Sequence, residues 1–443
     1  MDAVELSWGA RCVGLAFFVL SVLVVALAAV LLLVRRWPWC SCHVCRTYLT
    51  GSWAKDFTNL GDWYAHLLRE SPTGTVHIHV LGCTVTANPA NVEYMLKTNF
   101  ENFPKGKRFS ALLGDLLGGG IFNVDGDAWR HQRKMASLEL GSVTVRSYAY
   151  KIVAHEVETR LLPVLTDAAD KGKVVDLQDV FRRFAFDTIC KISFGLDPGC
   201  LDLDMPMSDL ANAFDTASRL SAMRGAAASP LVWKMKRMLN IGSERELKKA
   251  IKLVDDLASA MILQRRKLGF ENSHDLLSRF MASDGDVQAM DDKYLRDIVV
   301  SFLLAGRDTV ASALTTLFLH LSKNPQVAAA IRAEAGGDKP STDYEAFRPD
   351  RWLTGAGGSF APPSLYKYPV FQAGLRVCLG KELAVTEMKA VSVAVVRAFD
   401  VEVVGENGRS GWAPRFVAGL TASISGGLPV RIKRASTSSA DFK

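Results

Sequence analysis

The chain has 443 residues, a formal net charge of +7 and 49% hydrophobic content, which is enough for a large buried core. Its eight cysteines are scattered along the sequence, which excludes a small secreted disulfide scaffold and indicates reduced thiols. The sequence contains neither a dense Lys/Arg run with interleaved aromatic residues nor a zinc-finger spacing, so it gives no support to nucleic-acid binding.

The first predicted element is a membrane anchor over residues 13–34, an uncharged run of 22 residues. At about 1.5 Å per residue such a helix spans ~33 Å, close to the thickness of a bilayer core. Arg35 and Arg36 follow the run, and positive charge after the span predicts that the rest of the chain is cytosolic. A signal peptide is the alternative, but it carries its positive charge before a shorter apolar run.

Cysteines crowd together directly after the predicted anchor. Cys40, Cys42 and Cys45 surround His43, and these residue types are ligands for zinc. Four ligands within six residues leave little loop to wrap a tetrahedral ion. We therefore favour small residues at a membrane edge over a zinc site.

The rest of the chain is predicted to be mainly α with a small β-sheet. Alternation in Thr75–Val80 and a second β-rich piece at 84–86 predict a β-hairpin. Segments rich in Gly and Pro, notably 103–120 and 355–363, are predicted to be loops. Apolar periodicity predicts the following helices: 91–98, 128–138, 147–165, 177–194, 247–267, 293–322 and 381–399, with helical pattern continuing to about 335.

The strongest chemical signal is the segment from Phe371 to Gly380, which precedes an apolar helix. Cys378 would lie at the amino terminus of that helix, where the helix dipole and free N–H groups favour a thiolate. Gly374 and Gly380 permit tight turns and close approach to a flat ligand, and Arg376 suits an anionic group. The alternative for an isolated cysteine is a buried structural thiol.

A second signal lies in the long helix predicted over 293–322. Ala305 and Gly306 form a notch of small residues, and the pair Asp308 and Thr309 stands beside it. An acid and an alcohol at such a notch are suited to proton delivery. The structural alternative is that Thr309 merely bonds back to Ala305 O, as threonines in apolar helices do.

Further upstream, Trp129 and Arg133 are four residues apart, so both side chains share one face of the helix predicted there. Arg130 and Lys134 on the same helix suit docking of an acidic protein, although a solvated face is the plainer interpretation. A Pro-x-Arg element, Phe347 to Trp352, precedes the cysteine segment.

Taken together, these motifs resemble the cytochrome P-450 family over residues 30–335 and 343–432. The cysteine segment matches the family's haem-binding loop at Phe371, Gly374, Arg376, Cys378 and Gly380. The stretches 103–107, 120–124 and 299–309 are similar to a plant branch that ω-oxidises fatty acids and fatty-acid-derived conjugates such as jasmonoyl-amino acids.

The resemblance implies haem b with Cys378 as iron ligand, and Trp129, Arg133 and Arg376 as holders of its propionates. It also implies that Asp308 and Thr309 relay protons, and that Phe371, Gly374 and Gly380 shape the haem loop. The expected function is ω-hydroxylation of a lipid-like substrate with O2 and electrons from an NADPH-dependent cytochrome reductase. The expected location is the endoplasmic reticulum membrane, crossed once, with the catalytic domain cytosolic.

The resemblance also implies that residues 103–124 form a loop over the substrate pocket, which we call the roof. Phe302, Leu303 and 420–422 would further line this pocket. Domain boundaries are expected at 1–36 for the anchor, 37–50 for a linker rich in Pro and Cys, and 51–443 for the haem domain.

The family pattern is interrupted at 336–343. A helix with a Glu-x-x-Arg motif normally precedes the Pro-x-Arg element and pairs with its Arg, here Arg351. That helix and a few strands would need roughly sixty residues at ordinary rises per residue. Glu345 and Arg348 match the motif literally, but Pro349 disfavours helix at the preceding residue. We therefore expect an internal deletion, with Arg351 losing its partners and the hairpin losing neighbouring strands.

Two alternatives to a working monooxygenase stay open. The first is a catalytically impaired, membrane-tethered isoform that lacks stable haem because the bracing helix is missing. The second is a haem isomerase or dehydratase that needs no reductase, although such enzymes tend to lack the notch at 305–309.

Overall fold

A computed structural model gives the architecture of the chain. It describes residues 19–28, 40, 42–202, 209–226, 230–269, 274–283, 291–334, 353–354, 359–360, 363–404, 414–417 and 419–435. The chain separates into two compact units, one formed by Met1–Phe57 with Trp63–Val85 and the other by Thr58–Asp62 with Thr86–Lys443. The predicted deletion at 336–343 and the Pro-x-Arg element lie outside the described residues.

The first unit is small and built around an aromatic core. Trp63 is 3% exposed, and its ring stacks on the rings of Tyr48 and Trp53 at centroid distances of 6.4 Å. The predicted hairpin is confirmed, and among the described strands β1 and β2 form a sheet of two. The elements here are α2 (His43–Thr50), η1 (Ser52–Lys55), α3 (Leu60–Glu70), β1 (Thr75–Ile78), η2 (His79–Leu81) and β2 (Cys83–Thr86).

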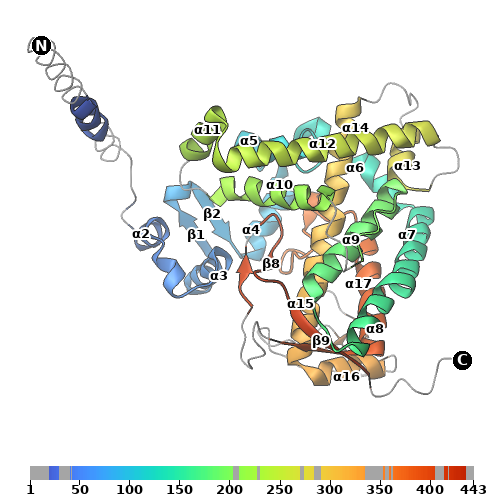
Figure 1. Cartoon of the computed structure of the whole chain (residues 1–443). Helices are drawn as coiled ribbons and strands as arrows, with labels where there is room; N and C mark the ends of the chain where they lie inside the picture. Colours follow the sequence, from blue (N-terminus) through green and yellow to red (C-terminus); the bar gives the residue numbers. More distant parts are fainter. Residues whose placement is uncertain are drawn as a thin grey trace, which may run out of the picture. The chain divides into compact units, whose positions relative to one another are not determined.

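The second unit is predominantly helical, as the sequence predicts (Figure 1). Its first helices are α4 (Pro89–Glu93), η3 (Tyr94–Thr98), η4 (Phe100–Asn102), α5 (Gly106–Leu117), α6 (Gly126–Gly141), α7 (Val143–Glu156), η5 (Val157–Leu161), α8 (Leu162–Asp170) and α9 (Leu177–Phe194). The middle helices are α10 (Asp209–Ala226), α11 (Pro230–Leu239), α12 (Gly242–Leu268) and α13 (Leu276–Ser283). The last are α14 (Asp292–Leu303), η6 (Leu304–Asp308), α15 (Thr309–Lys323), α16 (Pro325–Glu334), η8 (Gly374–Arg376) and α17 (Lys381–Ala398).

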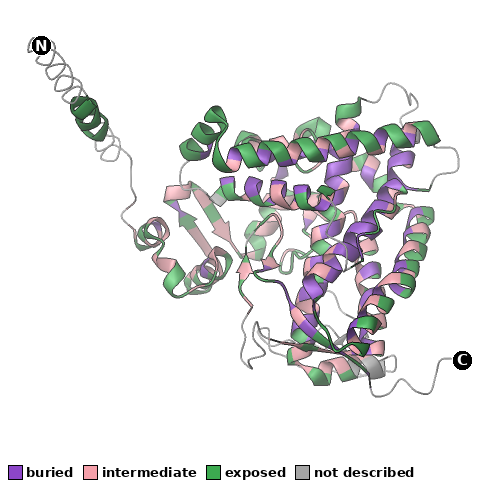
Figure 2. Cartoon of the chain, viewed as in Figure 1, coloured by how far each residue is buried: buried purple, intermediate pink, exposed green. Residues whose placement is uncertain are grey.

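Helix α9 is the central element of this unit. The Asp176 side chain caps its amino terminus by accepting from Gln178 N at 2.9 Å, and Gly195 ends it with φ +64°. Nearly all of α9 is buried (Figure 2), so it contributes to both hydrophobic clusters. One cluster joins α9 to α7, α8, α15 and α17, and the other joins it to α5, α10, α12 and α14.

Short antiparallel strands close the second unit. The largest sheet has the order β3-β9-β6, with Val175 opposite Val430 and Val401 opposite Ile432. Its central strand buries Val430 and Ile432 in the same cluster as α9, which attaches the carboxy-terminal residues to the helices. The strands are β3 (Val174–Asp176), β4 (Leu353–Thr354), β5 (Ser359–Phe360), β6 (Phe399–Val403), β7 (Phe416–Val417), β8 (Ser423–Ile424) and β9 (Pro429–Arg434).

One predicted loop is wrong. The segment 103–120 contains α5, a helix from Gly106 to Leu117 that buries Leu113, Leu116 and Leu117. Its apolar residues recur with helical spacing, and this periodicity outweighs Gly106 and Gly114 inside the helix. The residues on either side of it, 103–105 and 118–120, are irregular as predicted.

The described helices include one that is long and apolar enough to cross a membrane, Asp292–Lys323, which comprises α14, η6 and α15. Because 56% of its apolar window is buried inside the protein, it is a core helix of the second unit. Of the predicted anchor, the described part is Val19–Ala28, a helix with strongly exposed apolar side chains such as Leu23 and Val25.

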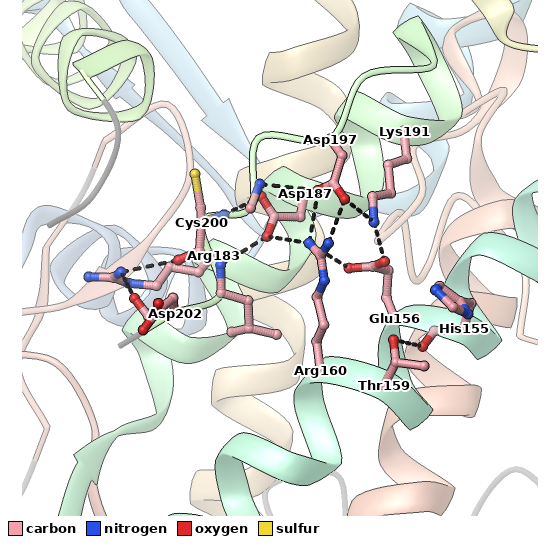
Figure 3. A network of polar contacts seen from close by, with 12 residues as sticks. His155, Glu156, Thr159, Arg160, Arg183, Asp187, Lys191, Asp197, Cys200 and Asp202 are labelled. Atoms are coloured by element: carbon pink, nitrogen blue, oxygen red, sulfur yellow. Dashed lines mark hydrogen bonds and ion pairs between the residues drawn. The ribbon is translucent and has the colours of Figure 1, made fainter. Parts of the chain in front are cut away.

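A network of buried charges joins α7, η5 and α9 (Figure 3). Asp187 of α9 is fully buried, and its carboxylate accepts from Cys200 N at 2.8 Å and Leu201 N at 2.9 Å. Arg160 lies 3.6 Å from Asp187 and 3.5 Å from the buried Glu156. The network therefore fixes the chain that follows α9 against two neighbouring helices.

We predict that Asp187→Asn lowers the free energy of unfolding by about 2–3 kcal/mol, because the amide places an N–H group opposite a buried backbone N–H that the carboxylate now accepts. Chemical denaturation followed by circular dichroism measures this change. The control Asp167→Asn removes an exposed pair with Lys171 and should cost less than about 0.5 kcal/mol. Equal effects of the two substitutions would contradict a bracing role for Asp187.

Candidate active site around Cys378

The cysteine loop is a compact series of turns that ends at α17. Cys378 N donates to Phe371 O at 2.7 Å, and Val377 N donates to Gly374 O at 3.3 Å. Gly380 is the residue before α17, and its carbonyl accepts from Ala384 N at 2.9 Å. The Cys378 thiol is exposed at this helix start, as the sequence predicts.

Position 374 requires glycine for two reasons, its backbone conformation and the closeness of a neighbouring segment. Its φ is +57°, and an added Cβ would lie 2.1 Å from the carbonyl oxygen of Leu96. The segment containing η3 and η4 therefore packs directly against the cysteine loop. The sequence motif identifies this glycine, but its partner segment was not predicted.

Helix α6 clamps the loop from another side. Trp129 is 7% exposed, and the guanidinium of Arg133 lies 5.9 Å from its ring and donates to the carbonyl oxygen of Val377. The Arg376 guanidinium lies 5.1 Å from the Trp129 ring and 4.9 Å from the Phe100 ring. The predicted proximity of Trp129 and Arg133 is thus confirmed, and Arg376 joins them.

Positive charge exceeds negative charge in this region. Arg376 lies 3.3 Å from Asp125, whose carboxylate also accepts from Lys105 N at 3.0 Å. Burial first, and then the charge of Arg376, lowers the pKa of the Lys105 ammonium to about 8. Burial likewise lowers the pKa of Arg133, while the nearby Cys378 raises it. Three cations around one carboxylate are suited to an anionic group.

The notch lies where the core helix widens into a π-helical turn, η6. Ala305 and Thr309 are exposed on a helix that is otherwise largely buried, and Thr309 Oγ1 donates to Ala305 O at 2.6 Å. The back-bonding alternative is therefore observed. Gly306 has a different role from the one predicted, because its missing side chain makes room for Ile189 of α9, which an added Cβ would meet at 2.3 Å.

A buried ion pair holds the opposite side of η6. Arg307 is fully buried, and its guanidinium forms two bonds to Asp215 of α10, at 2.5 and 3.1 Å. Asp308 lies 3.5 Å from the same guanidinium. Burial raises the pKa of the Asp308 carboxyl, although the charge of Arg307 lowers it. Asp308 is therefore a carboxyl group that takes up a proton more readily than an exposed one.

The predicted roof is attached to the core helix at its glycine-rich end. Gly119 N donates to the Asp297 carboxylate at 2.7 Å, and the Gln132 side chain donates to Gly119 O at 2.8 Å. An added Cβ at Gly118 would clash with Asp297, so the glycines permit this contact. The roof's placement beside α14 supports its predicted position.

The predicted lining is partly wrong. Leu303 is 1% exposed and belongs to the core, because it lies on the face of α14 that packs in the α9 and α12 cluster. Residues 420–422 do meet the core helix, since Ser312 Oγ donates to Ala422 O at 2.7 Å. Phe302 is half-buried, with its ring 5.5 Å from Phe280.

Fold and site together define a haem-thiolate protein. An exposed cysteine at a helix start would supply the thiolate ligand of the iron, and the surplus of cations beside it fits the carboxylates of haem propionates. Leu379, next to Cys378, packs in the same cluster as Leu304, next to Ala305, so both segments border one region. These residues therefore fit haem, with Cys378 as ligand and Arg133, Arg376 and Trp129 as neighbours of the propionates.

Comparison with known proteins gives the same result. The Cytochrome P450 family model matches residues 56–341 and 342–411. Cytochrome P450 94C1 of Arabidopsis thaliana is 49% identical, with 92% of this chain and 96% of that protein covered. Cytochrome P450 94B3 of the same plant is 42% identical, with 87% and 90% covered. The crystal structure of the cytochrome P450DA heme domain shares the fold, with a TM-score of 0.60 at 17% identity, and 84% and 92% covered.

The chain therefore belongs to the cytochrome P450 family, and to its CYP94 branch. It is a haem-thiolate monooxygenase that takes electrons from a redox partner and acts on a small-molecule substrate.

The same comparisons bear on the segment near residue 340. The family-model match is divided between residues 341 and 342. The alignment with Cytochrome P450 94C1 spans 479 positions, which is more than the 443 residues of this chain. Some positions of that relative therefore have no counterpart here.

Three residues of the site were not singled out from the sequence. Lys105 lies within a stretch that the resemblance used, but its charge was not assigned to the haem region. Asp125 and Asp215 carry no motif, and only the folded chain brings them to Arg376 and Arg307. Arg130, considered for docking a partner, is exposed and pairs with Glu101 and Asp127 at 2.6 Å.

We predict that Asp215→Asn lowers the free energy of unfolding by about 2–3 kcal/mol, because it leaves the buried Arg307 guanidinium without its main counter-charge. Thermal or urea denaturation measures the loss. The control is Glu246→Gln, which removes an exposed ion pair of 3.4 Å between Glu246 and Arg219. Arg219 lies in α10, as Asp215 does, and the control should change stability by less than about 0.5 kcal/mol. A wild-type stability for the Asp215 variant would mean that Arg307 is not held by this pair.

Helix α17 carries a buried carboxyl group on the residue Glu387. The side chain is 5% exposed, and its Oε1 has no hydrogen-bond partner among the described residues. Burial raises the pKa of the Glu387 carboxyl to about 8. The folded protein therefore keeps a proton at neutral pH that the unfolded chain releases, so stability falls as pH rises from about 4.5 to about 8.

We expect Glu387→Gln to be more stable than the wild type at pH 8, by on the order of 2–4 kcal/mol, and to differ little at pH 4.5. Melting curves at several pH values test this, with Glu382→Gln on the exposed face of α17 as the matched control. Parallel pH profiles for the wild type and the Glu387 variant would contradict the buried protonated state.

Proposed function

We propose that this monooxygenase acts on a fatty acid or a fatty-acid-derived conjugate and hydroxylates its ω carbon. The similarity to CYP94 proteins supports the substrate class, as do the roof stretches 103–107 and 120–124. We propose that the acyl chain lies between the roof, which contains α5, and the core helix. The side chains there are mainly aliphatic or aromatic, which suits an apolar substrate.

The observation that carries the proposal is the exposed Cys378 in a loop that is held beside Arg133 and Arg376. When bound, haem supplies oxygen activation and oxidation of the substrate C–H bond. Cys378 provides the thiolate, Arg133 and Arg376 hold propionates, and Trp129 positions both guanidinium groups. Phe371 supports the loop through its carbonyl bond to Cys378 N, and Gly374 and Gly380 allow its turns.

Thr309 and Asp308 are proposed to deliver protons. Thr309 Oγ1 lies on the exposed face of the notch, and releasing its bond to Ala305 O makes the hydroxyl available to donate. Asp308 is adjacent and nearly buried, and burial raises the pKa of its carboxyl, which suits a group that takes up and releases protons. Asp308 would then resupply the hydroxyl.

The proposed electron source is an NADPH-dependent cytochrome reductase at the endoplasmic reticulum membrane, with one span over 13–34 and the catalytic domain cytosolic. Two observations support membrane attachment. The helix Val19–Ala28 is apolar and exposed, and α11 exposes Met235 and Met238 beside Lys234 and Arg237. We also propose that residues 1–36 form the anchor, 37–50 a linker and 51–443 the haem domain.

We further propose that the chain lacks the Glu-x-x-Arg helix between α16 and the Pro-x-Arg element. The split family-model match and the alignment longer than the chain support this. An impaired isoform without haem is not supported, because the cysteine loop, its cation clamp and the notch are all formed among the described residues. α6 and the segment 94–102 hold the loop in the part of the chain that is described.

The test is a reduced carbon-monoxide difference spectrum of membranes containing this chain, followed by product analysis with a long-chain fatty acid, NADPH and reductase. We expect a thiolate-type Soret band and a terminal alcohol. Cys378→Ala should abolish both, whereas the matched control Cys83→Ser, in the other unit, should retain them.

Each other outcome contradicts a different part of the proposal. Hydroxylation at an internal carbon would contradict ω-selectivity. Protein present without the Soret band would mean that the missing helix is needed for haem retention. Turnover without NADPH would favour an isomerase or dehydratase.

A further inference from the structure

Three cysteine side chains converge in the first unit, outside the haem-thiolate site. The Sγ atoms of Cys40, Cys42 and Cys45 all lie within 4.8 Å of one another. Cys45 is fully buried, whereas Cys40 and Cys42 are half-buried. The cluster can therefore be reached from solvent through two of its members.

Backbone donors already point at these sulfurs. Cys42 is the residue before α2, and its Sγ accepts from Cys45 N at 3.4 Å. The Sγ of Cys45 accepts from Val80 N at 3.4 Å. Three thiolates this close together would repel one another, so a cation is needed to compensate their charges.

The surrounding sequence favours anionic sulfur. From residue 35 to residue 55 the chain contains Arg35, Arg36, Arg46 and Lys55 and no Asp or Glu. The first turn of α2 also lacks acidic residues. The cluster therefore lies at a helix amino terminus, in a stretch whose local sequence is basic and contains no carboxylate.

The geometry suits a three-coordinate ion. Metal–sulfur bonds of about 2.3 Å place three sulfurs about 4 Å apart around a planar ion, so small side-chain rotations would close the observed cluster. Among the described residues no His, Asp, Glu or fourth Cys joins the group. Structural zinc almost always takes four ligands, whereas thiolates also select the soft ion Cu(I).

We propose that Cys40, Cys42 and Cys45 form a three-thiolate site for a soft closed-shell metal ion, with Cu(I) as the fitting ion. The site goes beyond the monooxygenase function and does not depend on it. Binding displaces the remaining thiol protons and ties residue 40 to the first turn of α2. The short spacing of these cysteines leaves little loop to wrap a tetrahedral ion, but this objection does not apply to a three-coordinate one.

The experiment is an anaerobic competition for Cu(I) between the reduced, haem-loaded full-length chain and a chromophoric Cu(I) chelator. We expect one Cu(I) per chain to be withdrawn from the chelator. Cys40→Ser and Cys42→Ser should each weaken binding at least tenfold. Cys83→Ser, a half-buried cysteine of the same unit outside the cluster, should bind like the wild type.

X-ray absorption of the copper-loaded chain adds a direct readout, with three sulfur ligands at about 2.3 Å expected. Because Cys45 is buried and its variant could misfold, the two half-buried positions carry the test, with circular dichroism and the Soret band reporting folding. Absence of stoichiometric binding would overturn the proposal. So would equal affinity of the Cys42 and Cys83 variants, or a two-sulfur or four-ligand site.

Discussion

Arg133 of α6 donates to the carbonyl oxygen of Val377, and this bond joins the cysteine loop to a helix 244 positions earlier in the chain. The loop's own turns set its local shape, but they do not set its place in the molecule. Arg376, whose guanidinium lies close to the adjacent rings of Phe100 and Trp129, completes the attachment. Cys378 and the start of α17 are positioned as a consequence. The same contacts gather more cations than one carboxylate neutralises, which makes the region receptive to haem propionates.

The notch side of the core helix is positioned by contacts on its other sides. Gly306 lets α9 approach closely, and the fully buried Arg307 pairs with Asp215 of α10. A buried charge is tolerated only with a well-placed partner, so this pair restricts how η6 can rotate. Ala305 and Thr309 then remain exposed, because no helix packs over them in the described part of the chain. The residues that pack against other helices and the residues of the notch therefore lie on different faces of the same helical turn.

Two of the buried carboxyl groups, those of Asp187 and Glu387, respond differently to desolvation. Asp187 is satisfied by two backbone N–H groups and lies close to Arg160, so it functions as a structural acceptor. Glu387 has no such described partner at Oε1, and it is accommodated by keeping its proton.

Sequence alone determined the local chemistry. The spacing of Phe371, Gly374, Arg376, Cys378 and Gly380 identified the haem loop, and apolar periodicity located α9, the core helix and α17. Such patterns are local, because a turn or a helix is specified by residues a few positions apart. Tertiary structure decided which distant residues complete the site. Asp125, Asp215 and the Leu96 carbonyl lie far along the chain from their partners, and the three thiols near α2 became a site only when their sulfurs were seen to converge. Charge pairing and close packing across large sequence separations follow from the fold, and no periodicity in the sequence encodes them.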